Sequence, residues 1–146
     1  MNLSKKGEYA LRAMIGLSMN YGRGSVHTHD IAEIEHIPQK FLEQILLELK
    51  KAGLLESKRG RGGGYSLIKS PEDISLAEVI RIIDGRLAPL GCVSNWAHIK
   101  CPEESDCGLH KVMRDVRNAI VKILEDVSFA DVCKKTTGTL KTRWQV

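Results

Sequence analysis

The stretch "IPQKFLEQILLELKKAGLLESKRGRGGGYSLI", residues 37–68, combines a helix with a hairpin, and this pair decides the fold. Pro38 stands at or just before the start of a helix over about 39–52, and Gly53 closes that helix as a C-cap. The apolar positions of the helix fall on one face, formed by Leu42, Ile45, Leu46 and Leu49. Two short runs separated by a glycine-rich turn then predict a β-hairpin, with strands at Leu54–Lys58 and Gly64–Ile68.

Helical segments stand on both sides of this pair. Residues 4–20 predict a helix that Ser4 caps, with an apolar stripe of Ala10, Ala13, Met14, Leu17 and Tyr21. A short helix capped by Thr28 follows, and after the hairpin another helix runs from a Ser75 cap through Asp84. The order helix, short helix, turn, helix and hairpin is that of a winged helix-turn-helix. We therefore expect a mainly α fold with a small β-wing.

The third helix and the hairpin tip carry the side chains that are expected to contact DNA. Such a helix can lie in the major groove, where a lysine reaches phosphates or base edges, a glutamine pairs with adenine and a glutamate accepts from cytosine. A narrow minor groove attracts arginines at a hairpin tip. The candidate DNA contacts are Lys40, Glu43, Gln44, Arg59 and Arg61, together with Lys6 and Tyr9 of the first helix. An ordinary solvated helix face and a flexible hairpin are the alternatives.

Charge is distributed unevenly along the 146-residue chain, whose net charge is +4. Residues 1–70 hold 11 Lys and Arg against 7 Asp and Glu, whereas residues 71–110 hold 3 against 7. The basic N-terminal half suits a polyanionic partner, and the acidic segment is a poor candidate for a DNA-facing surface. No apolar run approaches the roughly 18–20 residues that cross a membrane. We expect a cytoplasmic protein with no membrane contact, no small-molecule substrate and no catalytic residue.

A heptad pattern marks the last long helix, over about 108–127. Its apolar positions are spaced 4, 3, 4, 3 and 4 residues apart, which is typical of a helix that packs lengthwise against another helix. The other predicted helices are short, so we favour a homodimer seam over an internal bundle. The seam consists of Leu109, Met113, Val116, Ile120, Ile123 and Val127. The polar segment from Thr136 onward is expected to be loosely held.

Three of the four cysteines fall within residues 91–110, a segment without a helical or strand period. They are Cys92, Cys101 and Cys107, and His110 follows three residues after the last. A disulfide is disfavoured in a reducing compartment, and structural zinc sites usually show closely paired CxxC ligands. A thiol sensor needs only one or two cysteines and leaves His110 unexplained. An iron–sulfur cluster accepts widely spaced thiolates and a histidine. Cys133, beyond the long helix, is expected to be a partly buried thiol.

Five segments of the chain together resemble a known bacterial family. The motifs "MNLSKKGEYALRAM", "PQKFLEQIL", "GLLESKRGRGGGYSL", "SLAEVIRIIDG" and "APLGC…C…CGLH" look like the IscR family of iron–sulfur cluster regulators. That family belongs to a broader group of winged-helix repressors, which includes NsrR, RirA and CymR. The resemblance covers about residues 1–135. It implies a homodimer that crosses its long helices, with a cluster loop just before each of them.

The resemblance also implies a ligand set. Cluster-bearing members bind through three loop cysteines, which correspond to Cys92, Cys101 and Cys107. The IscR branch adds a histidine, matched here by His110, and holds a 2Fe–2S cluster; a 4Fe–4S cluster is the alternative. NsrR-like relatives use an acidic residue of the first helix, so Glu8 is the rival fourth ligand.

These observations predict an iron–sulfur cluster-sensing regulator of transcription, a repressor or dual regulator, that binds double-stranded DNA as a homodimer. The alternatives are an NsrR-like nitric oxide sensor, a zinc- or thiol-based repressor of the same fold, and a small redox protein that passes electrons. The expected parts are a winged helix-turn-helix domain over 1–84, a cluster loop over 85–108, a dimerisation helix and short helix over 109–135, and a tail over 136–146.

Overall fold

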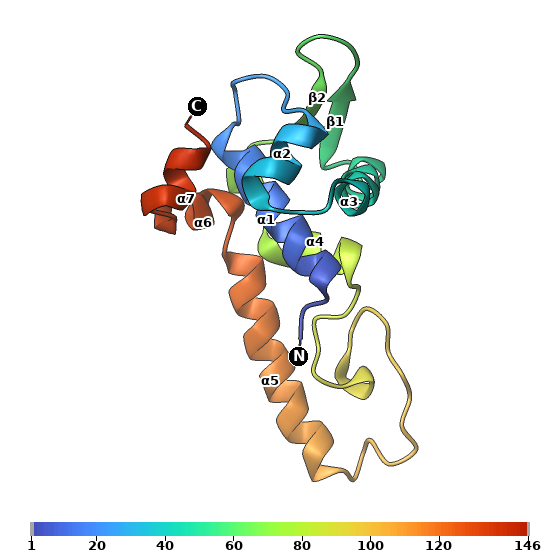
Figure 1. Cartoon of the computed structure of the whole chain (residues 1–146). Helices are drawn as coiled ribbons and strands as arrows, with labels where there is room; N and C mark the ends of the chain where they lie inside the picture. The colour runs from blue at the N-terminus through green and yellow to red at the C-terminus, as the bar shows by residue number, and fades with distance from the viewer. Residues whose placement is uncertain (1, 146) are drawn as a thin grey trace.

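The computed structural model describes residues 2–145 and shows a mainly helical fold with one two-stranded antiparallel sheet (Figure 1). The predicted fold class is confirmed. In chain order the elements are α1 Lys5–Met19, α2 Thr28–Glu35, α3 Gln39–Lys51, β1 Leu55–Lys58, β2 Gly64–Leu67, η1 Pro71–Asp73, α4 Leu76–Ile83, η2 Gly91–Val93, α5 Gly108–Asp126, α6 Phe129–Lys135 and α7 Gly138–Arg143. Within residues 2–145 no helix combines the length and the apolar composition that crossing a membrane requires.

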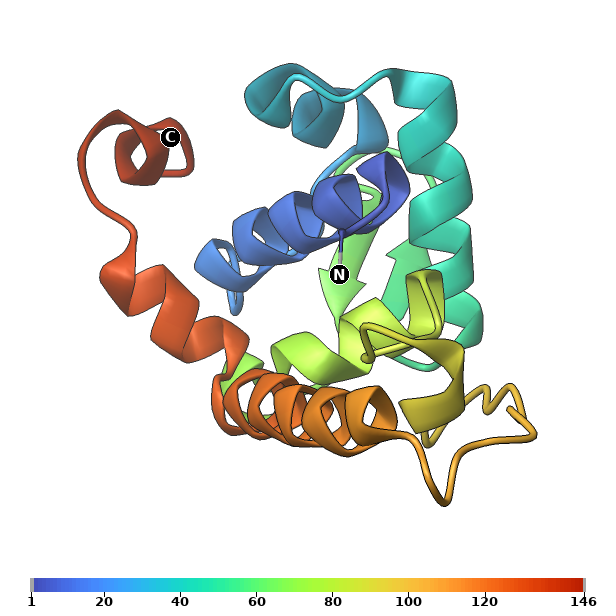
Figure 2. The ribbon, with the colours of Figure 1, turned by 90° about the horizontal axis from the view of Figure 1, so that it is seen from below.

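α1 lies at the centre of the globular part, and Figure 2 shows α2, α3 and α4 arranged around it. Ser4 caps this helix as predicted, because its Oγ accepts a hydrogen bond from the backbone N–H of Gly7 at 2.9 Å. The prediction that Tyr21 belongs to the apolar stripe is wrong, because α1 ends at Met19 and Tyr21 is 46% exposed. The remaining stripe residues are buried: Ala10, Ala13, Met14 and Leu17.

α2 and α3 meet at a tight turn. His36 adopts a left-handed conformation (φ 55°) at the end of α2, and Pro38 directly precedes α3 as predicted. The prediction that Thr28 caps α2 is wrong. The helix begins one residue earlier than expected, so His27 takes the cap position and no side chain caps the helix there. α3 buries the predicted face of Leu42, Ile45, Leu46 and Leu49.

The chain leaves α3 through a glycine turn and enters the β-hairpin. Gly53 (φ 86°) permits a left-handed turn, in which the backbone N–H of Leu54 donates to the Leu49 carbonyl at 3.0 Å. β1 and β2 pair antiparallel, from Leu55 opposite Leu67 to Lys58 opposite Gly64. The hairpin is therefore the predicted one, with each strand shorter by one residue at the end away from the tip.

The loop between α1 and α2 fixes the position of the hairpin. Val26 and Tyr65 exchange two backbone hydrogen bonds, at 2.9 and 2.8 Å. Gly64 permits this approach, because a Cβ at that position would lie 2.1 Å from the Val26 carbonyl oxygen. The wing is thereby attached to the residues that lead into α2.

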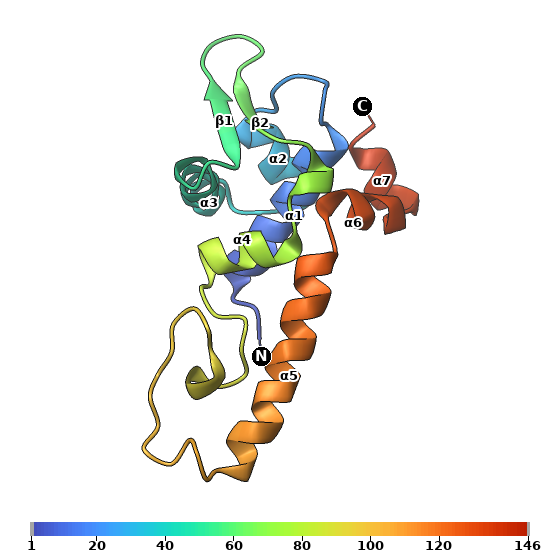
Figure 3. The same ribbon diagram turned by 180° about the vertical axis from the view of Figure 1, so that it is seen from behind.

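α5 extends away from the globular part, as Figure 3 shows. Its last turns pack against α4, where Arg81 forms an ion pair with Glu125 at 2.6 Å. Ser75 caps α4 as predicted, by accepting from the N–H of Glu78 at 3.2 Å. With 19 residues, α5 spans about 28 Å, so its first turns lie far from the helical core. α6 then returns across α1 and buries Phe129 completely.

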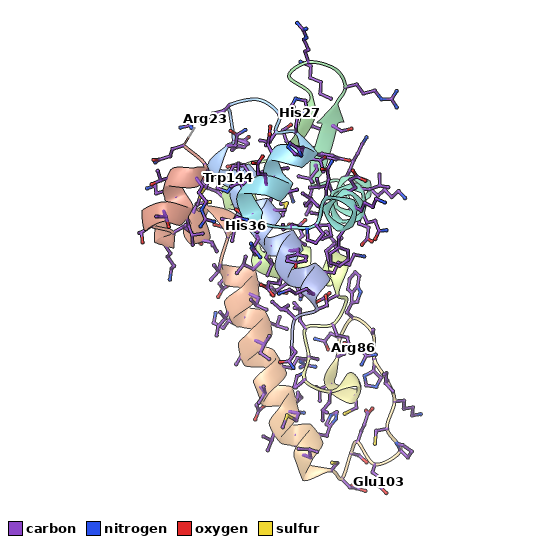
Figure 4. The ribbon with its side chains drawn as sticks, viewed as in Figure 1. Arg23, His27, His36, Arg86, Glu103 and Trp144 are labelled. Carbon is purple, nitrogen blue, oxygen red and sulfur yellow. The ribbon has the colours of Figure 1, made fainter. Side chains whose placement is uncertain are left out.

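The segment after α6 is docked on the core, and the prediction of a loosely held tail is wrong for Trp144. This residue is only 6% exposed, and Figure 4 shows it between α7 and the α1–α2 pair. Its indole occupies the space that a side chain on Gly16 would need, since a Cβ there would lie 2.0 Å from the ring. The indole N–H donates to Glu35 Oε1 at 2.6 Å, and Arg12 pairs with the other carboxylate oxygen at 3.5 Å.

We expect Trp144→Ala to lower the free energy of unfolding by about 3–5 kcal/mol, because it opens a cavity beside α1 and removes one partner of the buried Glu35 carboxylate. Urea denaturation monitored by circular dichroism measures the change. Trp96→Ala is the matched control, because Trp96 is 68% exposed. Equal effects of the two substitutions would show that α7 contributes nothing to the fold.

Candidate metal centre and nucleic-acid interface

The outer face of α3 is exposed, while its inner face is buried in the core. Lys40, Glu43 and Gln44 lie on the exposed side, as predicted, and we call these three residues the reading face. Leu47 lies on the same side of the helix and is 45% exposed. A helix that offers polar side chains on an unobstructed face fits the major groove of DNA.

The β-hairpin stands beside α3, and the two elements line a hollow of about 540 Å³. Glu43 and Arg59 both line it, so the structure brings these two candidate DNA contacts together. Arg61 lies at the exposed tip, outside the hollow. Sequence reasoning missed His27 and His29, which line the same hollow from the start of α2. No pattern in the sequence singled out these two histidines, which stand at the start of α2.

Lys6 and Tyr9 connect α1 to α3. The Lys6 ammonium pairs with the Glu48 carboxylate, and the Tyr9 ring lies edge-on to Phe41 with the ring centroids 5.6 Å apart. Both contacts orient α3 on α1. The structure thus places these two candidates in contact with α3, at the side of the reading face.

The cysteine loop, residues 85–107, folds beside the first turns of α5 (Figure 3). Its first half includes η2 and is buried at Leu87, Val93 and Ser94. The N–H of Ile99 donates to the Gly91 carbonyl at 3.0 Å and closes this half on itself. The second half is mostly exposed, and Figure 4 shows Glu103 at its outer edge.

Cys107 and His110 are positioned by the start of α5. Cys107 is the N-cap residue, and its Sγ accepts a hydrogen bond from the His110 N–H at 3.5 Å. The His110 ring points to the loop, with Nδ1 3.5 Å from Cys92 Sγ. His110 therefore joins two cysteines that are far apart in the sequence.

Cys101 is exposed in the second half of the loop. Its backbone N–H donates to Glu104 Oε1 at 2.9 Å, and the same oxygen lies 2.9 Å from His98 Nε2. The hydrogen bond from Cys101, together with the charges of His98 and His110, holds the pKa of Glu104 below its usual range. Across residues 2–145 no three Cys, His, Asp or Glu side chains converge as they would around a bound metal ion.

The four predicted ligands fit a soft metal centre in their chemistry. Thiolates and imidazole bind both zinc and iron–sulfur clusters. The His110 ring already lies beside Cys92, but no three of these side chains converge in residues 2–145, so the loop would have to close further, with Cys101 moving toward that pair. Its place in the exposed half of the loop leaves room for that movement.

Glu8, the rival ligand, lies in the first turn of α1. Its carboxylate pairs with Lys5 at 3.3 Å and with Arg12 at 3.9 Å. The Glu8 side chain is 48% exposed. Within the part of the chain that the structure describes, Glu8 is not brought together with the cysteines.

α5 carries an exposed apolar strip. None of its 19 residues is buried, and Ile123 is 63% exposed. Val112, which the heptad pattern left out, is 57% exposed on the same helix. Val127 is the C-cap residue and lies at the end of the strip. The predicted seam residues that keep part of their surface exposed within the helix are Leu109, Met113, Val116, Ile120 and Ile123.

Cys133 is a partly buried thiol on α6, as expected. Its Sγ donates weakly to the Ile15 carbonyl at 3.7 Å. Burial raises the pKa of this thiol, which disfavours the thiolate that metal binding requires. Cys133 is therefore a less suitable ligand than a thiol with an unraised pKa would be.

Comparison with known proteins identifies the family. The model of the Rrf2 family, described as an iron-dependent transcriptional regulator, matches residues 3–135. A Rhodobacter capsulatus protein named as an rrf2-like HTH-type transcriptional regulator is 39% identical over 136 residues, which covers 89% of this chain and 91% of that protein. These matches extend over nearly all of the elements described above, from α1 through α6.

Solved structures agree with this assignment. CymR, the global cysteine regulator of Bacillus subtilis, has a TM-score of 0.81 at 28% identity, covering 94% of this chain and 99% of that one. The T. potens IscR structure has a TM-score of 0.72 at 31% identity, covering 94% of each chain. The family model, the Rhodobacter capsulatus protein and CymR are all named as regulators rather than as enzymes. The chain therefore belongs to the Rrf2 family and is a DNA-binding transcriptional regulator with a winged-helix fold.

Proposed function

We propose that this regulator is a homodimer that senses an iron–sulfur cluster bound by Cys92, Cys101, Cys107 and His110. The observation that carries the proposal is the position of His110, whose backbone N–H and Nδ1 lie 3.5 Å from Cys107 Sγ and Cys92 Sγ, respectively. An imidazole beside thiolates is the ligand chemistry of a 2Fe–2S cluster in the IscR branch. The likeness to T. potens IscR supports the same assignment.

A cluster would supply a redox-sensitive centre whose stability depends on its ligands. The chain contributes three features to such a centre. Cys107 is fixed at the N-terminal end of α5, where its Sγ accepts the His110 N–H. A neutral imidazole donates less charge than a thiolate, so the bond from His110 would be the weakest of the four. The exposed half of the loop lets Cys101 approach or withdraw.

A continuous set of contacts connects the cysteine loop with the reading face. The loop begins immediately after Asp84, whose carboxylate accepts hydrogen bonds from the Ser4 N–H at 3.0 Å and from the Ser4 hydroxyl. Gly7 packs under the same carboxylate. Lys6 and Tyr9 then join α1 to α3. A loop movement that displaces Asp84 would act on the start of α1 and, through it, on the orientation of α3.

These contacts can regulate DNA binding only if α3 has two orientations, one that binds DNA and one that does not. The protein must also bind the ligand of the loop with different affinity in these two states. A coupling of about 1–3 kcal/mol is enough to change promoter occupancy severalfold to a hundredfold.

The homodimer is proposed from the exposed strip of α5. A helix of 19 residues without a single buried side chain is stable when its apolar side is covered by another helix. A second copy of α5 has the complementary heptad spacing. Pairing two copies would present two reading faces to successive half-sites of one operator.

A zinc- or thiol-based regulator is the second candidate. The observation in its favour is Cys101, which is exposed and whose backbone N–H is bonded to Glu104 rather than to another predicted ligand.

Anaerobic purification followed by metal, sulfide and absorbance analysis separates these functions. Iron, acid-labile sulfide and visible absorbance support the cluster. A colourless protein with stoichiometric zinc supports a zinc site. A metal-free protein whose operator affinity changes with reversible oxidation supports a thiol switch.

The fourth ligand can be identified from two substitutions. We expect His110→Ala to bleach the anaerobic cluster faster than wild type, because one iron site becomes open to water. Glu8→Gln is expected to leave the visible spectrum unchanged, since Glu8 pairs with Lys5 and Arg12 instead. His110→Cys should keep the cluster and lower its reduction potential, because a thiolate donates more charge than an imidazole. Loss of the cluster in Glu8→Gln alone would place the protein on the NsrR-like side.

The dimer prediction is tested on the most exposed seam residue. Ile123→Lys should bury an uncompensated charge and raise the dimer Kd by about 100-fold or more, measured by sedimentation equilibrium. Asp115→Lys is the control, because it introduces the same side chain on α5 outside the seam. A dimer that survives Ile123→Lys unchanged is incompatible with the seam.

The wing and the reading face should differ in the kind of DNA contact that they make. Arg59→Ala should weaken binding to all sequences alike and reduce the salt-dependence slope by about 0.9, if one phosphate contact is lost. Gln44→Ala should instead reduce discrimination between operator variants by about 1–3 kcal/mol. Fluorescence anisotropy titrations at several salt concentrations measure both. Unchanged binding in both variants would refute the docking of α3 and the wing on DNA.

A further inference from the structure

Arg117 is the one charged side chain of α5 that hydrogen-bonds to the cysteine loop in the described structure. Its Nη1 donates to the Val93 carbonyl at 2.8 Å and to Asn95 Oδ1 at 3.0 Å. Arg117 lies seven residues after His110, which is two helical turns, so both side chains leave α5 toward the loop. The two residues hold adjacent parts of one short segment, because Val93 follows Cys92 directly.

The Arg117 contact is made where the loop is most buried. Val93 is 2% exposed and Ser94 is 3% exposed. A charged donor forms a stronger hydrogen bond than a neutral one, and a buried carbonyl that loses its partner is destabilised. The bond therefore holds η2 against α5 more firmly than a bond at an exposed site would.

Hydrogen bonds within α5 also orient the guanidinium of Arg117. Its Nε and Nη2 donate to Asn118 Oδ1 at 3.0 and 2.6 Å, respectively. The planar group is thus anchored on α5 through one edge and reaches the loop through the other. A lysine could not make both sets of bonds, because its ammonium is a point charge without a fixed fork.

We propose that Arg117 is a positioning residue of the cysteine loop. It holds the first half of the loop on α5, so that the Cys92 thiol stays beside the His110 ring when no metal is bound. Cys101 lacks this anchor and is the ligand that joins last. The importance of this arrangement for a metal centre rests on the proposed function, whereas the anchoring itself is a property of the protein without metal.

Thiol alkylation of the metal-free protein tests the anchoring directly. Wild type, Arg117→Met and Arg117→Lys are prepared with a chelator and a reductant, then treated with iodoacetamide for increasing times, and each cysteine is quantified by peptide mass spectrometry. Arg114→Met is the matched control, because it removes the same charge and side-chain type from an exposed position of α5. Cys133, on α6, serves as an internal reference within every sample.

We expect Arg117→Met to increase the alkylation rate of Cys92 by about tenfold, which is the scale of one hydrogen bond to a charged group. Cys101 and Cys133 should react at wild-type rates, and Arg117→Lys should resemble Arg117→Met. An unchanged Cys92 rate overturns the assignment. Equal acceleration at Cys92 and Cys133 also overturns it, because that result means general loosening of the fold.

Anaerobic cluster reconstitution of the same variants separates this inference from the proposed function. A wild-type protein that forms no cluster, together with selective Cys92 acceleration in Arg117→Met, would refute the proposed function and leave the anchoring intact. A wild-type protein that forms a cluster, with an unchanged cluster lifetime and Cys92 rate in Arg117→Met, would refute the anchoring alone.

Discussion

Close packing along one side of α1 determines where the neighbouring elements lie. Small buried residues recur there at every third position, namely Gly7, Ala10, Ala13 and Gly16. At the two ends of this series the neighbours leave no space for a side chain. A Cβ on Gly7 would lie 2.5 Å from the Asp84 carboxylate, and one on Gly16 would meet the Trp144 ring. The start of α1 is thus held by the residue that precedes the cysteine loop, and its later turns are held by the C-terminal segment.

The sequence predicted the fold well wherever the information was local. The period of apolar residues marked α3, and glycine and proline marked its ends, because each restricts the backbone by itself. Thr28 was misplaced because a hydroxyl residue beside a helix start fits either the cap or the first turn. Trp144 was missed for a different reason. Its burial depends on Gly16 and Glu35, which are distant in sequence and show no periodic relation to it.

The candidate site shows the same difference between local contacts, which the sequence predicts, and contacts between distant residues, which it does not. Cys107 and His110 are three residues apart on one helix, so their proximity follows from local geometry. The approach of Cys92 depends on how residues 85–95 fold, and Arg117 gave no sign of its role in the sequence because arginines are common on exposed helix faces. For Cys101, membership of the ligand set is implied by family resemblance alone, because the structure holds its backbone at Glu104.

The two tryptophans stand in opposite surroundings. Trp96 lies 68% exposed in the cysteine loop, and Trp144 lies 6% exposed against the DNA-binding helices. Indole emission shifts to longer wavelength in water and to shorter wavelength in an apolar environment, so the two residues are spectrally distinct. The chain therefore carries one intrinsic fluorophore on each side of the junction at Asp84. Single-tryptophan forms of the protein would report separately on the cysteine loop and on the DNA-binding helices.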